Sequence, residues 1–190
     1  MTRSYTLGRR AEQQAETRRR IVDAAVALHG EIGPAQTTFS QIAERAGVQR
    51  HTVYAHFPDE WSILLACSGA SMEQDPPPDA APWRAIADRG ERLRTGLRAI
   101  YDWYDRNTGL LGCVLRDAEH YEPARRISEM RFGPVMASYH DALGAGLTAK
   151  QRGMLVLALS YFTWRTLARE AGLKQAAAVG AMAQAIEAAA

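Results

Sequence analysis

Hydrogen-bonding side chains are concentrated in the run between Phe39 and Phe57. Within that run the spacing lets one apolar residue, Val53, pack inward while its polar neighbours point elsewhere. The outward residues are Gln49, Arg50, His51, Thr52, Tyr54 and His56. Side chains of these types donate and accept hydrogen bonds, so the segment is suited to contacting a polar surface.

Two short helices that cross through a tight turn would position these side chains. Ile42 and Ala46 share one face of the first helix, and Ala43 is small enough to let a second helix approach. Gly47 can adopt the left-handed conformation that ends the first helix at little cost. The segment therefore predicts a helix-turn-helix motif. The alternative is a surface helix that is polar only to stay solvated, because Ala-x-x-x-Gly alone often occurs by chance.

The run from Thr37 through IAERAGV to TVYAHFPDE, preceded by a helix with Arg18, Arg19 and Arg20, closely resembles the N-terminal domain of the TetR family of bacterial transcriptional repressors. The resemblance covers about the first third of the chain. Beyond it only size and helical pattern are similar, since the family's second domain diverges with the ligand. The resemblance implies a DNA-binding regulator. Because the chain carries no recognisable catalytic or phosphate-binding motif, we expect that it is not an enzyme and has no cofactor.

The resemblance also implies roles for individual residues. Thr38 would cap the first helix of the motif and offer its hydroxyl to a phosphate, while the start of the second helix would face base edges. Tyr54 and His56 would hold the DNA backbone. The implied DNA-binding residues are Thr38, Gln49, Arg50, His51, Thr52, Tyr54 and His56.

Two residues depart from the family's pattern. Glu60 stands where the family usually carries a phosphate-contacting lysine, and we expect its carboxylate to repel a phosphate and weaken DNA binding. His29 stands where the family usually packs a phenylalanine into the core of this domain. We expect either a neutral, hydrogen-bonded histidine or a shifted helix end.

Composition indicates an ordinary soluble globule: of 190 residues, 47% are hydrophobic and 23% are charged, with a net charge of +2. That net charge is too small to indicate a nucleic-acid-binding protein. The first twenty residues, however, hold six arginines (3, 9, 10, 18, 19 and 20) against Glu12 and Glu16. This basic cluster suits a DNA duplex, although a solvated, flexible terminus has a similar composition.

Cysteine usage and hydropathy favour a cytoplasmic protein. Cys67 and Cys113 are the only cysteines, so neither a disulfide framework nor a zinc site is indicated, and both are expected in the core. The first residues lack an apolar signal region. The longest apolar stretch, Gly153 to Trp164, is too short to cross a bilayer.

The helical pattern predicts an all-α fold of roughly nine helices, with a three-helix DNA-binding head and a larger helical domain. Asp59 should cap a fourth helix. The proline-rich segment from Gln74 to Pro82 should be rigid and non-helical, and should separate the fourth helix from the next one. We therefore expect residues 1–58 to form the N-terminal arm and DNA-binding domain. Residues 59–72 would be a connector helix, and residues 73–190 would form the domain for ligand binding and dimerisation.

Two features of the second domain suggest how it works. Pro134 should kink the helix that Glu122 and Pro123 begin. The expected helix from Thr148 to Ala171 is apolar nearly all round, so something must cover its second face. A twofold homodimer, built as a four-helix bundle from the last two helices, would cover it. The alternative is a helix buried within its own chain.

Catalytic and metal-binding patterns are weak. The densest polar cluster, Asp117 to Glu122, could bind a metal or move a proton, but it is also typical of a solvated helix junction. We expect no catalytic or metal site. An apolar ligand pocket with a few hydroxyls is a further expectation, and the alternative, which is the more common one for any single residue, is that these side chains form solid core. Its residues would be Trp103, Cys113, Met130, Met136, Tyr139, Tyr161 and Trp164.

Three functions fit these observations. The preferred one is a repressor that a small, largely apolar molecule releases from operator DNA. The second is a DNA-binding dimer without a ligand. The third is an enzyme or scaffold that has kept the helical head and lost its DNA affinity, for which Glu60 is the supporting feature.

Overall fold

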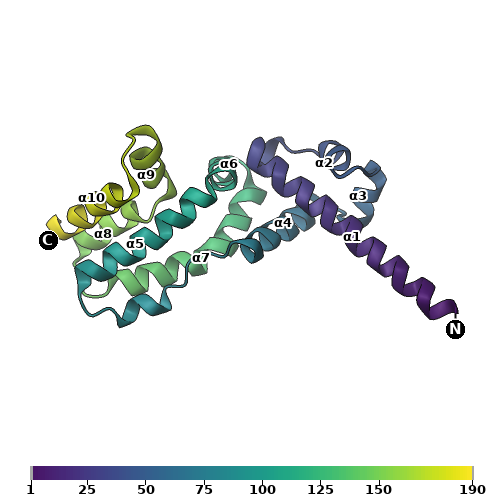
Figure 1. Ribbon diagram of the computed structural model, residues 1–190. Coiled ribbons are helices and arrows are strands. Elements are labelled where there is room, and N and C mark those ends of the chain that lie inside the picture. The colour runs from purple at the N-terminus through teal and green to yellow at the C-terminus, as the bar shows by residue number, and fades with distance from the viewer. Residues whose placement is uncertain (1, 190) are drawn as a thin grey trace. The chain divides into compact units, whose positions relative to one another are not determined.

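The computed structural model describes the backbone of residues 2–189 and the side chains of residues 8–189, and this part of the chain is all-helical (Figure 1). Its ten α-helices are α1 (Thr2–Glu31), α2 (Phe39–Ala46), α3 (Arg50–His56), α4 (Glu60–Gln74), α5 (Arg89–Arg106), α6 (Thr108–Ala118), α7 (Glu122–Gly144), α8 (Ala149–Ala158), α9 (Tyr161–Arg165) and α10 (Gln175–Ala188). Short 3-10 turns (Pro34–Gln36 and Ala81–Ala85) and a π-helical turn (Thr166–Glu170) lie between them. The all-α prediction is confirmed.

The tenth helix arises because the expected helix from Thr148 to Ala171 is broken, so that expectation was wrong. The Thr148 capping box forms as predicted, but α8 ends at Ala158 and α9 begins at Tyr161. A break leaves backbone carbonyls without helical partners. The buried hydroxyls of Tyr101 and Tyr104 donate to the carbonyls of Ala158 and Leu159, at 2.9 and 2.6 Å.

The chain forms two compact units. The first contains the N-terminal residues up to Pro76 together with Gly109–Glu129, and the second contains Pro77–Thr108 and the residues from Met130 onward. Helix α6 and the start of α7 therefore pack with the N-terminal helices. The predicted domain boundary at the proline-rich segment stays a prediction, as does the kink in α7, which runs through Pro134.

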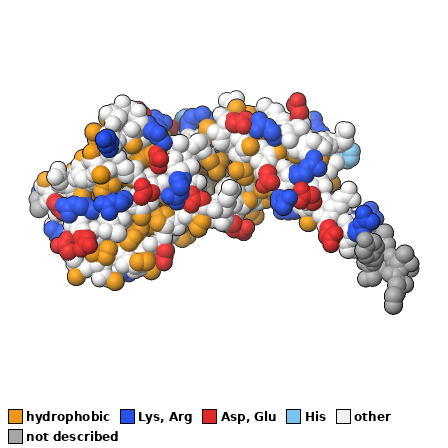
Figure 2. Space-filling view, in the orientation of Figure 1, with side chains coloured by type: hydrophobic (Ala, Val, Ile, Leu, Met, Phe, Trp, Pro, Cys, Tyr) orange, Lys and Arg blue, Asp and Glu red, His pale blue; other side chains and the backbone are white. Residues whose placement is uncertain are grey.

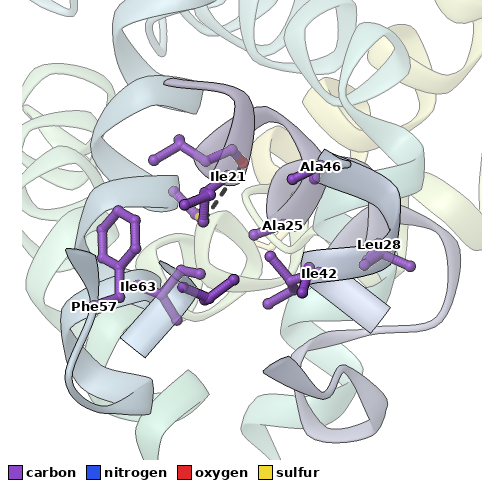
Figure 3. Close-up of a cluster of buried hydrophobic side chains, with 12 residues drawn as sticks. Ile21, Ala25, Leu28, Ile42, Ala46, Phe57 and Ile63 are labelled. Carbon is purple, nitrogen blue, oxygen red and sulfur yellow. Dashed lines mark hydrogen bonds between the residues drawn. The ribbon is translucent and has the colours of Figure 1, made fainter. Parts of the chain in front are cut away.

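The core of the first unit is built from one stripe of α1. Ile21, Ala25 and Leu28 recur at helical spacing and meet Ile42 of α2 and Phe57 after α3 (Figure 3). All five are buried. Because each fully buried large apolar side chain stabilises the fold by about 1.5 to 3 kcal/mol, this core fixes the crossing of α2 and α3 on α1.

The second unit packs α5 against α10. The apolar stripe of α5 (Leu93, Leu97, Ile100) is fully buried, and the predicted stripe of α10, formed by Val179, Met182, Ala183 and Ile186, is buried too. Gly96 lets α7 approach α5 closely, since a Cβ there would lie 2.6 Å from a methyl carbon of Leu143. None of the described helices is both long and apolar enough to cross a membrane.

Candidate nucleic-acid interface

The turn of the motif has the geometry that its sequence predicts. Thr38 caps α2, with its Oγ1 accepting the N–H of Gln41 at 3.3 Å, and the Gln41 side chain accepts the Thr38 N–H at 2.8 Å. Gly47 ends α2 with φ 64° and ψ 40°, in the left-handed region that favours glycine. Val53 is fully buried, so the second helix drops back onto the first as expected.

The predicted DNA-contacting side chains lie on the outer surface of this crossing. Because α3 buries Val53, its polar residues face away from the core. Thr38, Gln49, Arg50, His51 and Tyr54 are exposed, while Thr52 and His56 are half-buried. The structure therefore places all seven on the head, from the cap of α2 to the last residue of α3. Their contacts with DNA stay a prediction.

Tyr54 is held in place by residues on both helices. Its ring lies 4.7 Å from that of Phe39 at the start of α2, and its hydroxyl accepts a hydrogen bond from Arg50 at 3.1 Å. The Arg50 guanidinium lies 5.5 Å from the centre of the same ring. Two of the proposed DNA-contacting residues thus fix each other's side chains in one turn of α3.

Two arginines of the basic cluster have structural roles that sequence reasoning missed. The Arg20 guanidinium donates to the carbonyls of Ala46 and Gly47, which end α2. Arg18 donates to the carbonyl of His56 at 3.3 Å and covers the ring of Phe57. Cations at helix C-termini satisfy orphan carbonyls and complement the helix dipole. These two arginines therefore hold the ends of α2 and α3 onto α1.

The basic cluster does not form a continuous positive face in the view of Figure 2, where acidic side chains alternate with basic ones along α1. Arg19, for example, pairs with Glu16 at 2.7 Å. From Gly8 to Arg20 every side chain except Thr17 is exposed, and of these residues Arg18 and Arg20 bond to the ends of α3 and α2. An exposed helix of mixed charge keeps the charge available to solvent or to a polyanion.

His29 is buried as a neutral side chain. Only 4% of its surface is exposed, and burial lowers its pKa from 6.5 to about 4, although the nearby Asp117 carboxylate favours the charged form. Helix α1 continues past it to Glu31, so the helix end is not shortened at His29. The expected neutral state is supported, and its hydrogen bonding stays a prediction.

Glu60 is engaged within its own unit. The Tyr121 hydroxyl donates to Glu60 Oε2 at 2.6 Å. Burial and this carboxylate raise the pKa of Tyr121 above its ordinary range, so the hydroxyl stays a donor. The carboxylate that we expected to oppose phosphates therefore has a partner on the segment before α7. Its effect on DNA binding stays a prediction.

The polar cluster around Asp117 is a structural junction. Asp117 is buried, accepts the N–H of Ala35 at 2.9 Å and pairs with Arg116 at 2.7 Å. Its neighbours Glu119 and His120 are exposed, and the His120 Nε2 lies 3.9 Å from the Glu119 Oε2. Among the side chains that the structure describes, no three His, Cys, Asp or Glu residues gather in a way that could hold a metal ion.

The residues predicted to line a ligand pocket do not lie in one kind of environment. Trp103, Tyr161 and Trp164 are buried among aromatic rings of the second unit, and Tyr139 is buried with its hydroxyl donating to the carbonyl of Pro78 at 2.9 Å. Of the two methionines, Met130 is exposed and Met136 is half-buried.

Cys113 belongs to the first unit, where its thiol donates to the carbonyl of Gly30 at 3.5 Å. It is half-buried, whereas Cys67 is buried in the core as expected, with its pKa raised to about 12 by burial. The clefts near Arg92 and near Asp102 have polar linings and include none of the predicted pocket residues.

Comparisons with known proteins agree with this architecture. Residues 21–67 match the family described as bacterial regulatory proteins, tetR family. The HTH-type transcriptional regulator Mb2274c of Mycobacterium bovis is 30% identical over 142 residues, which are 75% of this chain and 70% of that protein. A solved TetR-family regulator from Mesorhizobium loti has a TM-score of 0.64 at 18% identity, over 93% of this chain and 96% of that one. FadR from Bacillus subtilis, solved with stearoyl-CoA, has a TM-score of 0.60 at 18% identity, over 90% and 98%.

An all-helical chain whose first unit presents an exposed recognition helix after a left-handed glycine turn has the architecture of a helix-turn-helix regulator. The two solved structures support this fold alone, because their identities are low. The family match and the extent of identity with the mycobacterial regulator decide the family. The chain belongs to the TetR family of bacterial regulatory proteins and is a helix-turn-helix transcriptional regulator.

Proposed function

We propose that this regulator is a homodimeric repressor that binds double-stranded operator DNA through α3 and leaves it when a small, largely apolar ligand binds. The exposed polar surface of α3, held on the apolar core of the first unit, is the observation that carries the proposal. A helix of this kind enters the major groove with its N-terminal residues at the base edges. Arg50 and His51 would read bases, and Thr38, Tyr54 and His56 would hold phosphates.

A homodimer through α8, α9 and α10 is supported by apolar side chains that the chain leaves uncovered. Val156 and Leu157 on α8 are 56% and 52% exposed, and Leu173 before α10 is 37% exposed. The exposed face of α10 is rich in alanine, which lets a neighbouring helix approach closely. Two copies packed as a four-helix bundle would bury both surfaces and place two recognition helices on one duplex.

A largely apolar ligand is supported by the aromatic cluster of the second unit. Trp164 is fully buried against Tyr104 and Tyr161, and its indole N–H has no hydrogen-bond partner. An unpaired buried donor costs free energy, so a ligand that carries one acceptor on an apolar body would relieve that cost. FadR from Bacillus subtilis, which has a similar fold, was solved with stearoyl-CoA, and the long acyl chain of this molecule makes it a suitable first probe.

The proposal assigns the chain a binding role in the cytoplasm and no catalytic role. The second candidate is a DNA-binding dimer without a ligand, which the contacts of Tyr104 with Tyr161 and Trp164 favour, because rings that pack against one another leave little room between them. If the ligand domain is solid, apolar probes should bind weakly and should not affect the protein's DNA affinity.

One experiment separates these functions. A duplex is selected by the protein from a random-sequence pool, and its affinity is measured against salt and with increasing stearoyl-CoA. The repressor should bind the duplex with a steep salt dependence. Stearoyl-CoA should lower the protein's affinity for the duplex by about 5- to 150-fold, and the duplex should lower the protein's affinity for stearoyl-CoA by the same factor. Unchanged DNA affinity at saturating probe would favour the ligand-independent dimer. A failure to bind any duplex would contradict both.

A further inference from the structure

One short segment of the first unit, residues 116–121, forms hydrogen bonds on both sides of the helix-turn-helix motif. It contains the last turn of α6 and the turn that precedes α7. We call it the bridging segment. Its two partners flank the motif: Ala35 comes before α2, and Glu60, more than twenty residues later, comes after α3. This segment therefore touches the chain just before α2 and again just after α3.

On the first side, Asp117 holds the turn from which α2 starts. Its Oδ2 accepts the backbone N–H of Ala35 at 2.9 Å, and Arg116 donates to its Oδ1 and to the carbonyl of Ile32 at 3.0 Å. Gly33 has φ 96°, and a Cβ there would lie 2.3 Å from Asp117 Oδ2, so the backbone approaches the carboxylate as closely as glycine allows.

On the second side, Tyr121 holds the start of α4. Its hydroxyl donates to Glu60 Oε2 at 2.6 Å. Glu60 is the first residue of α4 and follows the last residue of α3, His56, by four positions. A second contact lies beside it, where the Arg126 guanidinium covers the ring of Trp61 at 4.6 Å from its centre. Asp59 caps the same helix, with its side chain accepting the N–H of Ser62 at 2.7 Å.

The two holding points are kept at a fixed spacing by the backbone of the bridging segment. The carbonyl of Asp117 accepts the N–H of Tyr121 at 2.7 Å and that of His120 at 3.0 Å. The carboxylate of one residue and the hydroxyl of the other therefore sit on a single closed turn. A change in that turn would move the start of α2 relative to the end of α3.

We propose that Asp117 and Tyr121 are positioning residues for DNA binding, because the bridging segment sets the spacing between the two phosphate-contacting ends of the motif. Those ends are Thr38, three residues after Ala35, and Tyr54 with His56, just before Glu60. The inference rests on the DNA contacts proposed above. It also gives Glu60 a role opposite to the expected repulsion: the carboxylate orients α3 by accepting from Tyr121.

The test is a double-mutant cycle on Tyr121 and Glu60, read out as binding to a duplex selected by the wild-type protein and to a scrambled duplex. Tyr121→Phe removes one hydroxyl and changes no charge. It should lower affinity for the selected duplex by about 2- to 10-fold, which corresponds to one net hydrogen bond, and should lower the ratio of selected to scrambled affinity. Glu60→Ala should do the same, and the double variant should be no worse than either single one.

Glu60→Gln is the matched control, since the amide oxygen can still accept from Tyr121. It should bind the selected duplex within about twofold of wild type. Tighter binding by Glu60→Gln and Glu60→Ala alike, with Tyr121→Phe unchanged, would overturn the inference and show instead that Glu60 repels phosphates. Equal losses on both duplexes in proportion to unfolded protein would show a role in stability alone and would also overturn it.

The contact between Asp117 and Ala35 can be tested without DNA. Amide exchange at Ala35 should be slow in the wild-type protein and faster in Asp117→Ala, with Asp117→Asn in between because its amide oxygen can still accept. The loss of selected-duplex affinity should follow the same order. If Ala35 exchanges as fast in wild type as in Asp117→Ala, the bridging segment does not hold the turn. If the wild type binds no duplex, the proposed function fails first.

Discussion

The rings of Phe39 and Tyr54 lie 4.7 Å apart and join the first residue of α2 to the middle of α3. This contact fixes the direction of the Tyr54 hydroxyl, which also accepts a hydrogen bond from Arg50. Ring pairs of this kind add about 0.5 to 1.5 kcal/mol beyond the area they bury. The ring and the hydroxyl of Tyr54 therefore have separable roles, one in packing and one at the DNA surface.

Tyr54→Phe should keep the ring contact and lose the phosphate contact. We expect the free energy of unfolding to change by less than about 0.5 kcal/mol, and affinity for specific and for random DNA to fall by similar factors of about 2 to 10. Fluorescence anisotropy with the two duplexes gives both factors, and urea unfolding gives the stability. A change of sequence preference without loss of affinity would contradict the backbone role.

Arg50→Ala should act on sequence choice. If Arg50 reads a base edge, its loss should cost about 1 to 3 kcal/mol at one base position and relax the preference there. Binding to a set of duplexes that differ at single positions measures this. Arg19→Ala is a suitable control, because Arg19 is exposed, pairs with Glu16 and lies outside the motif. An equal loss on every duplex would place Arg50 at a phosphate instead.

Gly33→Ala should destabilise the first unit. The backbone at Gly33 has φ 96°, and a Cβ would overlap the carboxylate of Asp117 and the guanidinium of Arg116. We expect a loss of about 2 to 4 kcal/mol in the free energy of unfolding. Gly8→Ala is the control, since Gly8 is exposed, helical and has no atom within 4 Å of its added Cβ. A loss below about 1 kcal/mol for Gly33→Ala would mean that the turn relaxes easily.

Acid should destabilise the protein through His29. Its folded pKa of about 4 is below the ordinary 6.5, so between these values the unfolded state binds more protons and stability falls as pH falls. From pH 7.5 to pH 5 this group should contribute a loss of about 2 kcal/mol. Urea unfolding of the wild type and of His29→Phe at the two pH values measures it. The variant should lack this part of the loss, and an identical loss in both proteins would exclude His29 as its cause.

Local signals in the sequence were enough to place most helix ends. Thr38, Asp59 and Thr148 cap helices, and Gly47 ends one, because each acts through hydrogen bonds or dihedral angles within a few residues. The crossing of α2 and α3 also depends on residues that are close in sequence, namely the turn at Gly47 and the packing of Val53 on α2. This is why the placement of the exposed polar residues of α3 could be predicted, although their contacts with DNA remain to be tested.

Contacts between distant residues could not be predicted in the same way. The break after α8 depends on hydroxyls of Tyr101 and Tyr104 that lie more than fifty residues earlier, and no glycine or proline marks it. The partner of Glu60 is likewise supplied by Tyr121, sixty-one residues away. A single sequence gives the types of such residues but not their pairing. The polar residues around Asp117 stand out in the sequence, but the sequence does not show that Asp117 bonds to Ala35.

The proposed dimer can be tested at Leu157, which is 52% exposed in the single chain on the apolar α8. In a twofold interface one substitution acts twice, and a buried leucine contributes about 1.5 to 3 kcal/mol, so Leu157→Glu should convert the dimer to monomer at micromolar concentration. Affinity for the selected duplex should then fall, because a monomer engages one half-site. Sedimentation velocity measures the association state. Leu65→Glu, at a 38% exposed position on α4 of the other unit, is the control and should remain dimeric. A dimeric, folded Leu157→Glu protein would mean that the two copies meet through another surface.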